Sequence, residues 1–133
     1  MPRLIFFILL LVHSIGHLQG AIVASGFKDF EKWNANSWPL HKWVSIQAQH
    51  TICLILYVIT SLITLAVALC FKEWALSNCS WKLLGFWAAT FSWISMFIFP
   101  SAFAMFFNYI GAVSVNILLY YSFIISDGWL VKA

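Results

Sequence analysis

The feature that most limits what this chain can fold into is the length of its apolar segments. Residues 4–26 and 46–71 form two runs without Lys, Arg, Asp or Glu, and residues 83–125 form a third and longer one. A membrane-spanning helix needs about 20 predominantly apolar residues. The first two runs each fit one crossing, and the third must fold back once.

Composition places the chain in a membrane rather than in water. Hydrophobic residues make up 63% of the sequence and charged residues only 8%, whereas soluble domains average about 45–50% and about 25%. A soluble domain of 133 residues buries too little surface to hide so many apolar side chains. We therefore exclude a soluble domain, a disordered chain and a nucleic-acid-binding module. We predict an all-α, single-domain integral membrane four-helix bundle over residues 1–133.

The third apolar run is divided by its turn-forming residues. Pro100 lacks a backbone donor and disfavours an uninterrupted helix. The other turn candidates are Asn108, Tyr109 and Gly111. Residues 100–110 would then form a tight, aromatic re-entry at the membrane interface. The predicted spans are about 4–26, 46–71, 83–99 and 111–130.

The polar segments 27–47 and 72–82 carry tryptophans that suit a membrane interface, where the indole ring faces lipid and its N–H faces water. Lys and Arg near span ends favour the cytoplasmic side. With the N-terminus inside, four such residues lie inside and three outside. The inside group is Arg3, Lys72, Lys82 and Lys132, and the outside group is Lys28, Lys32 and Lys42. We therefore predict that both termini are cytoplasmic.

The first run has some features of a secretory signal peptide, namely Arg3 at its start and Val23-Ala24-Ser25 near its end. It is longer than a signal core and contains His and Gln, so we interpret it as a retained helix. If it were cleaved, three spans would remain.

The three cysteines form no C-x-x-C pair. With both termini inside, Cys70 and Cys79 face a reducing compartment, and we expect free thiols. The inverted orientation would permit a Cys70–Cys79 disulfide. Cys53 is interpreted as a small buried apolar residue.

One stripe of the first span combines two signals. At about 100° per residue, His13, Gly16, His17, Gly20 and Ala24 fall on the same helix face. Small residues four apart let another helix approach closely, which makes Gly16, Gly20 and Ala24 candidates for helix packing. Ionisable residues within a membrane normally face the bundle interior, so we expect this stripe to point at the other helices.

Two interpretations of His13 and His17 stand side by side. In the first, neutral imidazoles hydrogen-bond to polar groups of the other spans. The candidate polar interior residues are Tyr57, Thr60, Ser61, Thr64, Thr90, Ser92, Ser95, Asn116 and Tyr120.

In the second interpretation, the histidines bind haem, a divalent metal or a quinone. An i, i+4 histidine pair can hold Zn²⁺ or Cu²⁺, but a third ligand is needed, and no Asp or Glu lies within a span. His50 and Cys53 are the candidates. Bis-histidine haem would require His50 to ligate opposite His13 or His17, across a depth mismatch of roughly 9 Å at 1.5 Å per residue.

The run from His13 to Gly20 resembles the H-G-x-x-H-x-x-G pattern in the first helix of small, uncharacterised four-helix bacterial membrane proteins. Ser14 stands where that pattern has glycine. Those proteins also carry a proline after the third helix and a small-residue, asparagine-led entry into the fourth, to which Pro100 and residues 111–116 are similar. The resemblance implies four helices and a bacterial inner membrane, and it implies no activity.

No motif in the sequence predicts catalysis. There is no phosphate loop, nucleophile elbow or H-E-x-x-H, and we predict no catalytic residue. We expect a structural or accessory subunit that packs through the Gly/His face of the first span, in contact with lipid and with itself or other membrane subunits. The alternative is a haem-, metal- or quinone-binding redox subunit that uses His13, His17 and His50.

Overall fold

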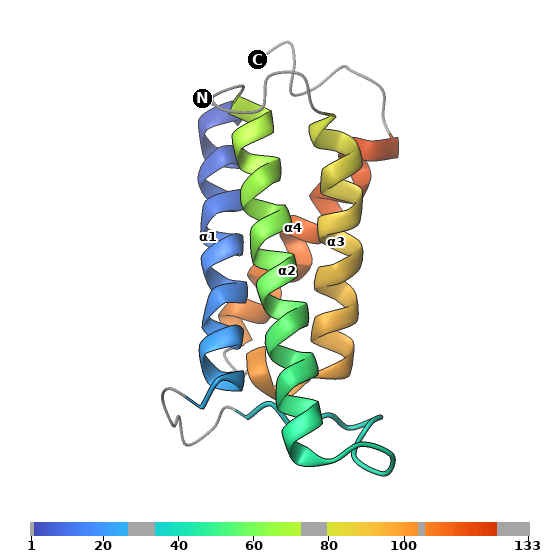
Figure 1. The fold of residues 1–133 in the computed structure, drawn as a ribbon. Helices are drawn as coiled ribbons and strands as arrows, with labels where there is room; N and C mark the ends of the chain where they lie inside the picture. The colour runs from blue at the N-terminus through green and yellow to red at the C-terminus, as the bar shows by residue number, and fades with distance from the viewer. Residues whose placement is uncertain (1, 27–33, 73–79, 104–105, 125–133) are drawn as a thin grey trace.

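The computed structural model describes residues 2–26, 34–72, 80–103 and 106–124. This part of the chain contains four α-helices, one short 3₁₀ helix and no strand, which confirms the predicted all-helical, four-helix architecture. The helices are α1 Pro2–Ala24, α2 Ile46–Lys72, α3 Trp81–Ile98, η1 Pro100–Phe103 and α4 Phe106–Ile124. The first three stand side by side, and α4 crosses behind them at an angle (Figure 1).

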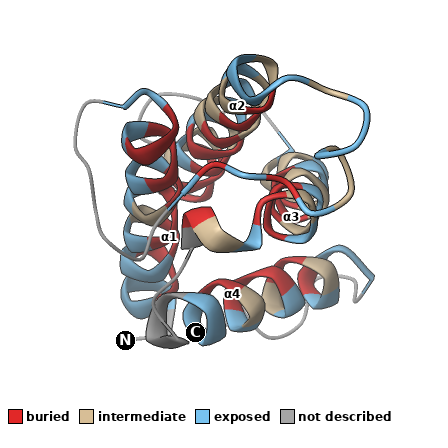
Figure 2. Cartoon of the chain, turned by 90° about the horizontal axis from the view of Figure 1, so that it is seen from below, coloured by how far each residue is buried: buried red, intermediate tan, exposed pale blue. Residues whose placement is uncertain are grey.

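The four helices surround a common centre toward which their buried faces point, as the view along the bundle shows (Figure 2). Helices adjacent in sequence make the most extensive contacts, whereas α1 and α4 touch less. Because α1 and α3 lie diagonally opposite one another, a bond between their side chains crosses the centre of the bundle.

Local signals determine where the helices end. Gly26 follows α1 with a φ of 68°, a left-handed conformation that glycine adopts without strain after a helix. The Ser80 hydroxyl caps the start of α3 by accepting the Leu83 N–H at 3.4 Å. Phe99 alone separates the end of α3 from Pro100, which begins η1, where the chain reverses.

The fourth helix begins earlier than predicted. We expected a re-entry over residues 100–110 and a helix from residue 111, whereas α4 begins at Phe106. Placing Asn108 and Tyr109 in the turn is therefore wrong, because both lie within α4, as does Gly111, which we expected at the start of the fourth span. The chain reverses instead at η1, residues 100–103. The turn preferences of Asn and Gly are weak, and helix packing overrides them. The predicted end at residue 130 lies outside the described residues.

Two helical segments are long and apolar enough to cross a membrane, judged by length and composition: Arg3–Ala24 and Ile46–Phe71. The other two are shorter. α3 has 18 residues and α4 has 19, and the apolar part of α4 is the shorter segment Tyr109–Ile124.

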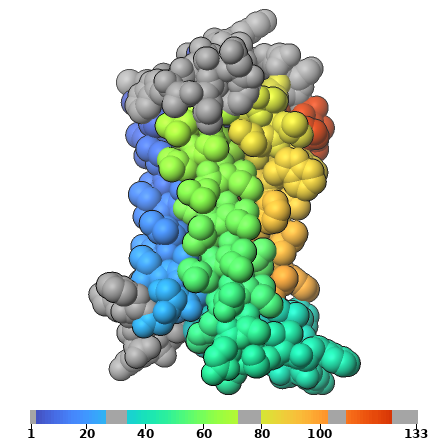
Figure 3. Space-filling view, viewed as in Figure 1, coloured from blue at the N-terminus to red at the C-terminus, as the bar shows by residue number. Residues whose placement is uncertain are grey.

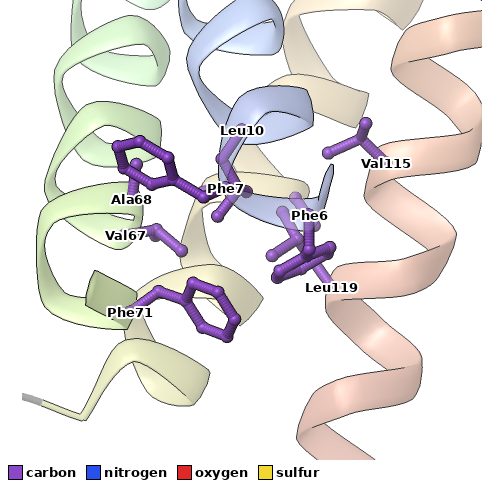
Figure 4. Close-up of a cluster of buried hydrophobic side chains, with 10 residues drawn as sticks. Phe6, Phe7, Leu10, Val67, Ala68, Phe71, Val115 and Leu119 are labelled. Carbon is purple, nitrogen blue, oxygen red and sulfur yellow. The ribbon is translucent and has the colours of Figure 1, made fainter. Parts of the chain in front are cut away.

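The interior contains two apolar clusters at different heights in the bundle. The first apolar cluster lies near the start of α1 and is shown in Figure 4. Its buried members are Phe6, Phe7, Leu10, Val67, Ala68, Phe71, Ala88, Ala89, Val115 and Leu119. The second apolar cluster lies near the end of α1. Its buried members are Ala21, Ala24, Ala35, Cys53, Tyr57, Met96, Phe99, Ala102 and Ala112.

The cysteines differ from one another in state. Cys53 is free and buried, whereas Cys70 is disulfide-bonded. The prediction of a free thiol at Cys70 is therefore wrong. That prediction followed from the orientation with both termini inside. Only one more Lys or Arg on the inside than on the outside favours this orientation. Cys79 lies outside the described residues.

Candidate functional site

A layer of buried polar side chains separates the two apolar clusters. Along α1, α2 and α3, the polar residues lie between residues of the first apolar cluster and residues of the second. On α4, the one polar residue of the layer, Asn116, lies next to Val115 of the first apolar cluster. This polar layer consists of His13, Ser14, His17, Thr60, Ser61, Thr64, Ser92, Ser95 and Asn116, all of them buried. Every helix contributes at least one member, so the layer is the level at which all four helices meet through polar groups.

Four residues of the layer form a connected cluster across three helices. His17 Nε2 lies 3.0 Å from Ser92 Oγ and 3.3 Å from His13 Nε2. Asn116 Nδ2 donates to the same Ser92 hydroxyl at 2.8 Å. Because α1 and α3 are diagonal neighbours, the contact between His17 and Ser92 crosses the bundle centre, and Asn116 joins α4 to it. We refer to His13, His17, Ser92 and Asn116 as the His–Ser–Asn cluster.

One placement of protons fits these contacts. Ser92 Oγ has two acceptor positions, which take an N–H of Asn116 and the Nε2–H of His17. Its own proton then points to Met96 Sδ at 3.7 Å. The Asn116 side chain also lies beside the imidazole of His13, although its Oδ1 makes no hydrogen bond of good geometry to any described residue. Ser92 is therefore the hub of the cluster.

A second polar contact joins α1 to α2 symmetrically. Ser14 Oγ donates to the Ser61 carbonyl at 2.9 Å, and Ser61 Oγ donates to the Ser14 carbonyl at 2.9 Å. The two hydroxyl oxygens are 3.1 Å apart. Such a reciprocal pair requires the two backbones to lie close together, and it fixes the register of α1 against α2.

A tight contact between α1 and α2 lies next to the polar layer, at Gly20. A Cβ atom added there would lie 2.4 Å from the Tyr57 ring, closer than any real contact. Tyr57 is fully buried, its hydroxyl donates to the Phe99 carbonyl at 3.2 Å, and its ring centroid lies 5.5 Å from that of His17. The buried ring is thus held by its hydrogen bond to Phe99 and by its contact with His17.

Other residues predicted for the polar interior bond largely along their own helices. Thr60 Oγ1 donates to the Leu56 carbonyl at 2.7 Å and lies 3.4 Å from Ser95 Oγ on α3. Thr64 Oγ1 donates to the Thr60 carbonyl at 2.8 Å. These bonds satisfy the hydroxyls, but they contribute less to joining the helices than the His–Ser–Asn cluster does.

The remaining predicted residues occupy different surroundings. The Tyr120 hydroxyl lies 3.1 Å from Thr90 Oγ1, between α4 and α3. Ala24 is buried in the second apolar cluster. Gly16 and His50 are half-buried, the latter in the second turn of α2. Among the described residues, no three His, Cys, Asp or Glu side chains are arranged to hold a metal ion.

Sequence reasoning identified the histidines and several of their neighbours but not the connections among them. Ser92 was one of several candidate partners, and nothing in its spacing marks it as the hub. Ser14 was noted only as a departure from a glycine pattern. The position of Ser14 next to His13 could have identified it, because this position lies at the edge of the buried stripe of α1.

Comparison of the chain with protein-family models, with curated proteins and with solved structures found no match.

Proposed function

We propose that the chain is a multi-pass integral membrane protein of a bacterial inner membrane and acts as a small structural or accessory subunit without enzymatic activity. The observation that carries the proposal is the apolar outside of the bundle, which surrounds a buried polar layer and differs from the polar outside of a soluble helical bundle. Soluble bundles place polar residues outside and apolar residues inside. Here nine polar residues form a buried layer, while large apolar side chains cover the outside of the helices.

The outward-facing apolar residues occur on all four helices. They include Leu4, Ile8, Val12 and Ile15 on α1, Ile55 and Leu62 on α2, Trp87, Ile94 and Phe97 on α3, and Ile110, Ile117 and Ile124 on α4. Figure 3 shows the face on which α2 lies between α1 and α3. A monomeric soluble protein rarely exposes one continuous apolar patch above a few hundred Å², so this distribution supports a lipid environment.

The contacts of the polar layer support a structural role for it. His17, Ser92 and Asn116 bond to one another, and Ser14 bonds to Ser61. Interhelical hydrogen bonds of this kind hold membrane helices together where lipid removes any hydrophobic drive for association. Most of the Gly/His face of α1 is buried within this chain, so contact with a partner subunit would use a different face.

The disulfide state of Cys70 supports an orientation opposite to the one favoured by the count of Lys and Arg. Disulfides persist in oxidising compartments such as the periplasm and are rare in the cytosol. Cys70 lies in the last turns of α2, at the end of the bundle where α1 begins and α3 begins (Figure 1). We therefore favour an orientation in which this end faces the periplasm and segment 34–45 faces the cytoplasm.

A second candidate function rests on one distance. Two nitrogen ligands of a tetrahedral Zn²⁺ at about 2.0–2.1 Å lie roughly 3.3 Å apart, and His13 Nε2 and His17 Nε2 are 3.3 Å apart. Ser92 Oγ and Asn116 Oδ1 are the oxygen atoms available nearby. Against this, no buried carboxylate is present among the described residues to balance a divalent charge, and such a charge is costly to bury without a partner. We therefore place the structural role first.

Three measurements test these proposals. Washing membranes with alkaline carbonate should leave the protein in the membrane pellet, and release into the supernatant would refute membrane integration.

Native electrophoresis of gently solubilised membranes should show a band larger than the monomer, and a monomer alone would contradict the accessory role. An absorption spectrum of the purified protein should show no band from a cofactor, and metal analysis of the same sample should show no stoichiometric metal. A Soret band or bound metal that disappears in the His13→Leu/His17→Leu variant would establish the redox alternative.

A further inference from the structure

Segment 34–45, which precedes α2, is held by hydrogen bonds within it and to Gln49 of α2. The buried side chain of Gln49 braces it at two points, because its Oε1 accepts the Ser37 N–H at 2.8 Å and its Nε2 donates to the Val44 carbonyl at 2.8 Å. The Leu40 carbonyl accepts the Val44 N–H at 3.0 Å. The segment is therefore a fixed structure, which we call the anchor loop.

The anchor loop is also fastened to the opposite side of the bundle. Trp38 Nε1 donates to the Phe97 carbonyl in the last turn of α3 at 2.6 Å. The Asn34 N–H donates to the Ser101 carbonyl in η1 at 3.3 Å. These bonds hold the loop at the level where the apolar surfaces of α2 and α3 end, and it projects from that end of the molecule (Figure 3).

The projecting part of the anchor loop presents an aromatic ring next to a cation. Trp43 is 84% exposed, and its indole N–H has no hydrogen-bond partner among the described residues. Lys42 and His41 beside it are exposed, and His41 is held through its Nδ1 contact with the Trp38 carbonyl. Residues 34–50 contain no Asp or Glu, so no acidic side chain within this stretch offsets the charge of Lys42.

We propose that the anchor loop docks on anionic phospholipid, with the Trp43 ring at the boundary between headgroups and acyl chains and the Lys42 ammonium group on lipid phosphate. The proposal rests on the membrane location proposed above. An exposed indole with a free N–H suits this boundary, where one side of the ring is apolar and the other is wet. A cation with no carboxylate in its own stretch, residues 34–50, favours an anionic lipid over a zwitterionic one. The orientation proposed above places the loop at the cytoplasmic leaflet, whose surface potential is negative.

The depth of residue 43 gives the first test. The variants Trp43→Cys and Leu62→Cys, each in the full chain and carrying a spin label, are reconstituted in vesicles of phosphatidylcholine with an equal part of phosphatidylglycerol. Accessibility to oxygen and to a water-soluble nickel complex then gives the depth of each label. Leu62 lies near the middle of α2 and is 60% exposed, so its label should lie in hydrocarbon, and the label at residue 43 should lie at the headgroup boundary.

The two labels separate failure of this inference from failure of the proposed function. A label at residue 62 in water would refute the membrane location itself. A label at residue 62 in hydrocarbon with residue 43 in bulk water would overturn the anchor-loop proposal alone. If residue 43 is exposed to water in vesicles but shielded in native membranes, a protein covers the loop, and the lipid proposal is wrong.

The choice of lipid gives the second test. Binding of phosphatidylglycerol to the folded loop should raise the midpoint of thermal unfolding relative to vesicles of phosphatidylcholine alone, by about 4 °C if one phosphate contact is gained. Lys42→Gln should lose most of this rise, and Lys42→Arg should keep it because the charge is retained. An equal rise in Lys42→Gln, or no rise in the wild-type protein, would overturn the assignment of Lys42 to anionic lipid.

Discussion

The first apolar cluster and the polar layer occupy neighbouring levels of the same bundle and hold it together in different ways. In the first apolar cluster, aromatic and aliphatic side chains pack together without directional bonds. The rings of Phe6 and Phe71, for example, pack edge to face with their centroids 5.1 Å apart. In the polar layer, contacts are directional bonds between named atoms, such as the pair of 2.9 Å bonds between Ser14 and Ser61. Both levels are buried, but only one of them distinguishes one register of the helices from another.

The difference between the two levels has a physical basis in the proposed lipid environment. A buried leucine gains little hydrophobic free energy over a leucine that faces lipid, because lipid tails are equally apolar. The first apolar cluster therefore contributes packing alone. A polar group of the layer that lost its partner would instead remain unpaired in an apolar medium. We infer that the polar layer and the close contact beside it determine how the helices are aligned.

The largest effect is expected at Gly20, the close contact beside the polar layer. In Gly20→Ala the new methyl group meets the Tyr57 ring at 2.4 Å, and Tyr57 is held by its bond to the Phe99 carbonyl. Thermal or denaturant unfolding in detergent should show a loss of about 2 kcal/mol, typical of overpacking. The matched control is Gly111→Ala on α4, where nothing lies within 4 Å of the added Cβ.

The control should move in the opposite direction, which makes the comparison sharper. Alanine in a helix interior is more favourable than glycine by about 1 kcal/mol, so Gly111→Ala should be neutral or stabilising. If Gly20→Ala were also stabilising, helix propensity would outweigh the contact with Tyr57. The close approach of α1 to α2 would then play no part in aligning the helices.

Ser92 is the next test, because it is the hub of the His–Ser–Asn cluster. Ser92→Ala leaves His17 Nε2 and Asn116 Nδ2 without their shared hydroxyl, and we expect a loss of about 1–2 kcal/mol in the free energy of unfolding. Ser122→Ala is the matched control, since Ser122 is equally buried but donates to the Leu118 carbonyl of its own helix. Equal losses for the two variants would show that the cluster adds nothing beyond satisfying single hydroxyls.

The reciprocal serine pair is expected to have a smaller effect. Ser14→Ala and Ser61→Ala each remove one bond from a hydroxyl to a backbone carbonyl, and interhelical bonds of this kind are worth about 0.6–2 kcal/mol in membranes. We therefore expect each variant to lose about 1 kcal/mol in the free energy of unfolding, and the double variant to lose roughly the sum, because the two carbonyls remain in place. Single variants as stable as the wild-type protein would show that the reciprocal bonds do not help to align the helices.

The sequence allowed the architecture to be predicted because length and composition act over whole segments. The apolar runs gave α2 within one residue, and Pro100 predicted the end of α3. The start of α4 was predicted wrongly, because Asn108 and Gly111 have only weak turn preferences and the reversal is instead made in η1. Local propensity of this size is easily outweighed by tertiary packing.

The candidate site was predictable in its location but not in its connections. Spacing alone places His13, His17 and Gly20 on one face of a helix, and this required no knowledge of the other helices. The partner of that face depends on how α3 and α4 rotate and slide against α1, which the sequence spacing within α3 and α4 does not specify. For the same reason Ser14 was not predicted to join two helices, although it forms a reciprocal pair of bonds with Ser61.

The smallest effect is expected in the first apolar cluster. Leu10 is fully buried there, and Leu10→Met keeps nearly the same volume in a flexible side chain, so the free energy of unfolding should fall by less than about 1 kcal/mol. The measurement is the same unfolding experiment, with Ser92→Ala as the internal reference. Both substitutions alter one buried side chain without adding bulk, and they differ in whether a directional bond is lost. A loss at Leu10 larger than the loss at Ser92 would reverse the comparison, because shape in the apolar cluster would then align the helices more strongly than the bonds of the polar layer.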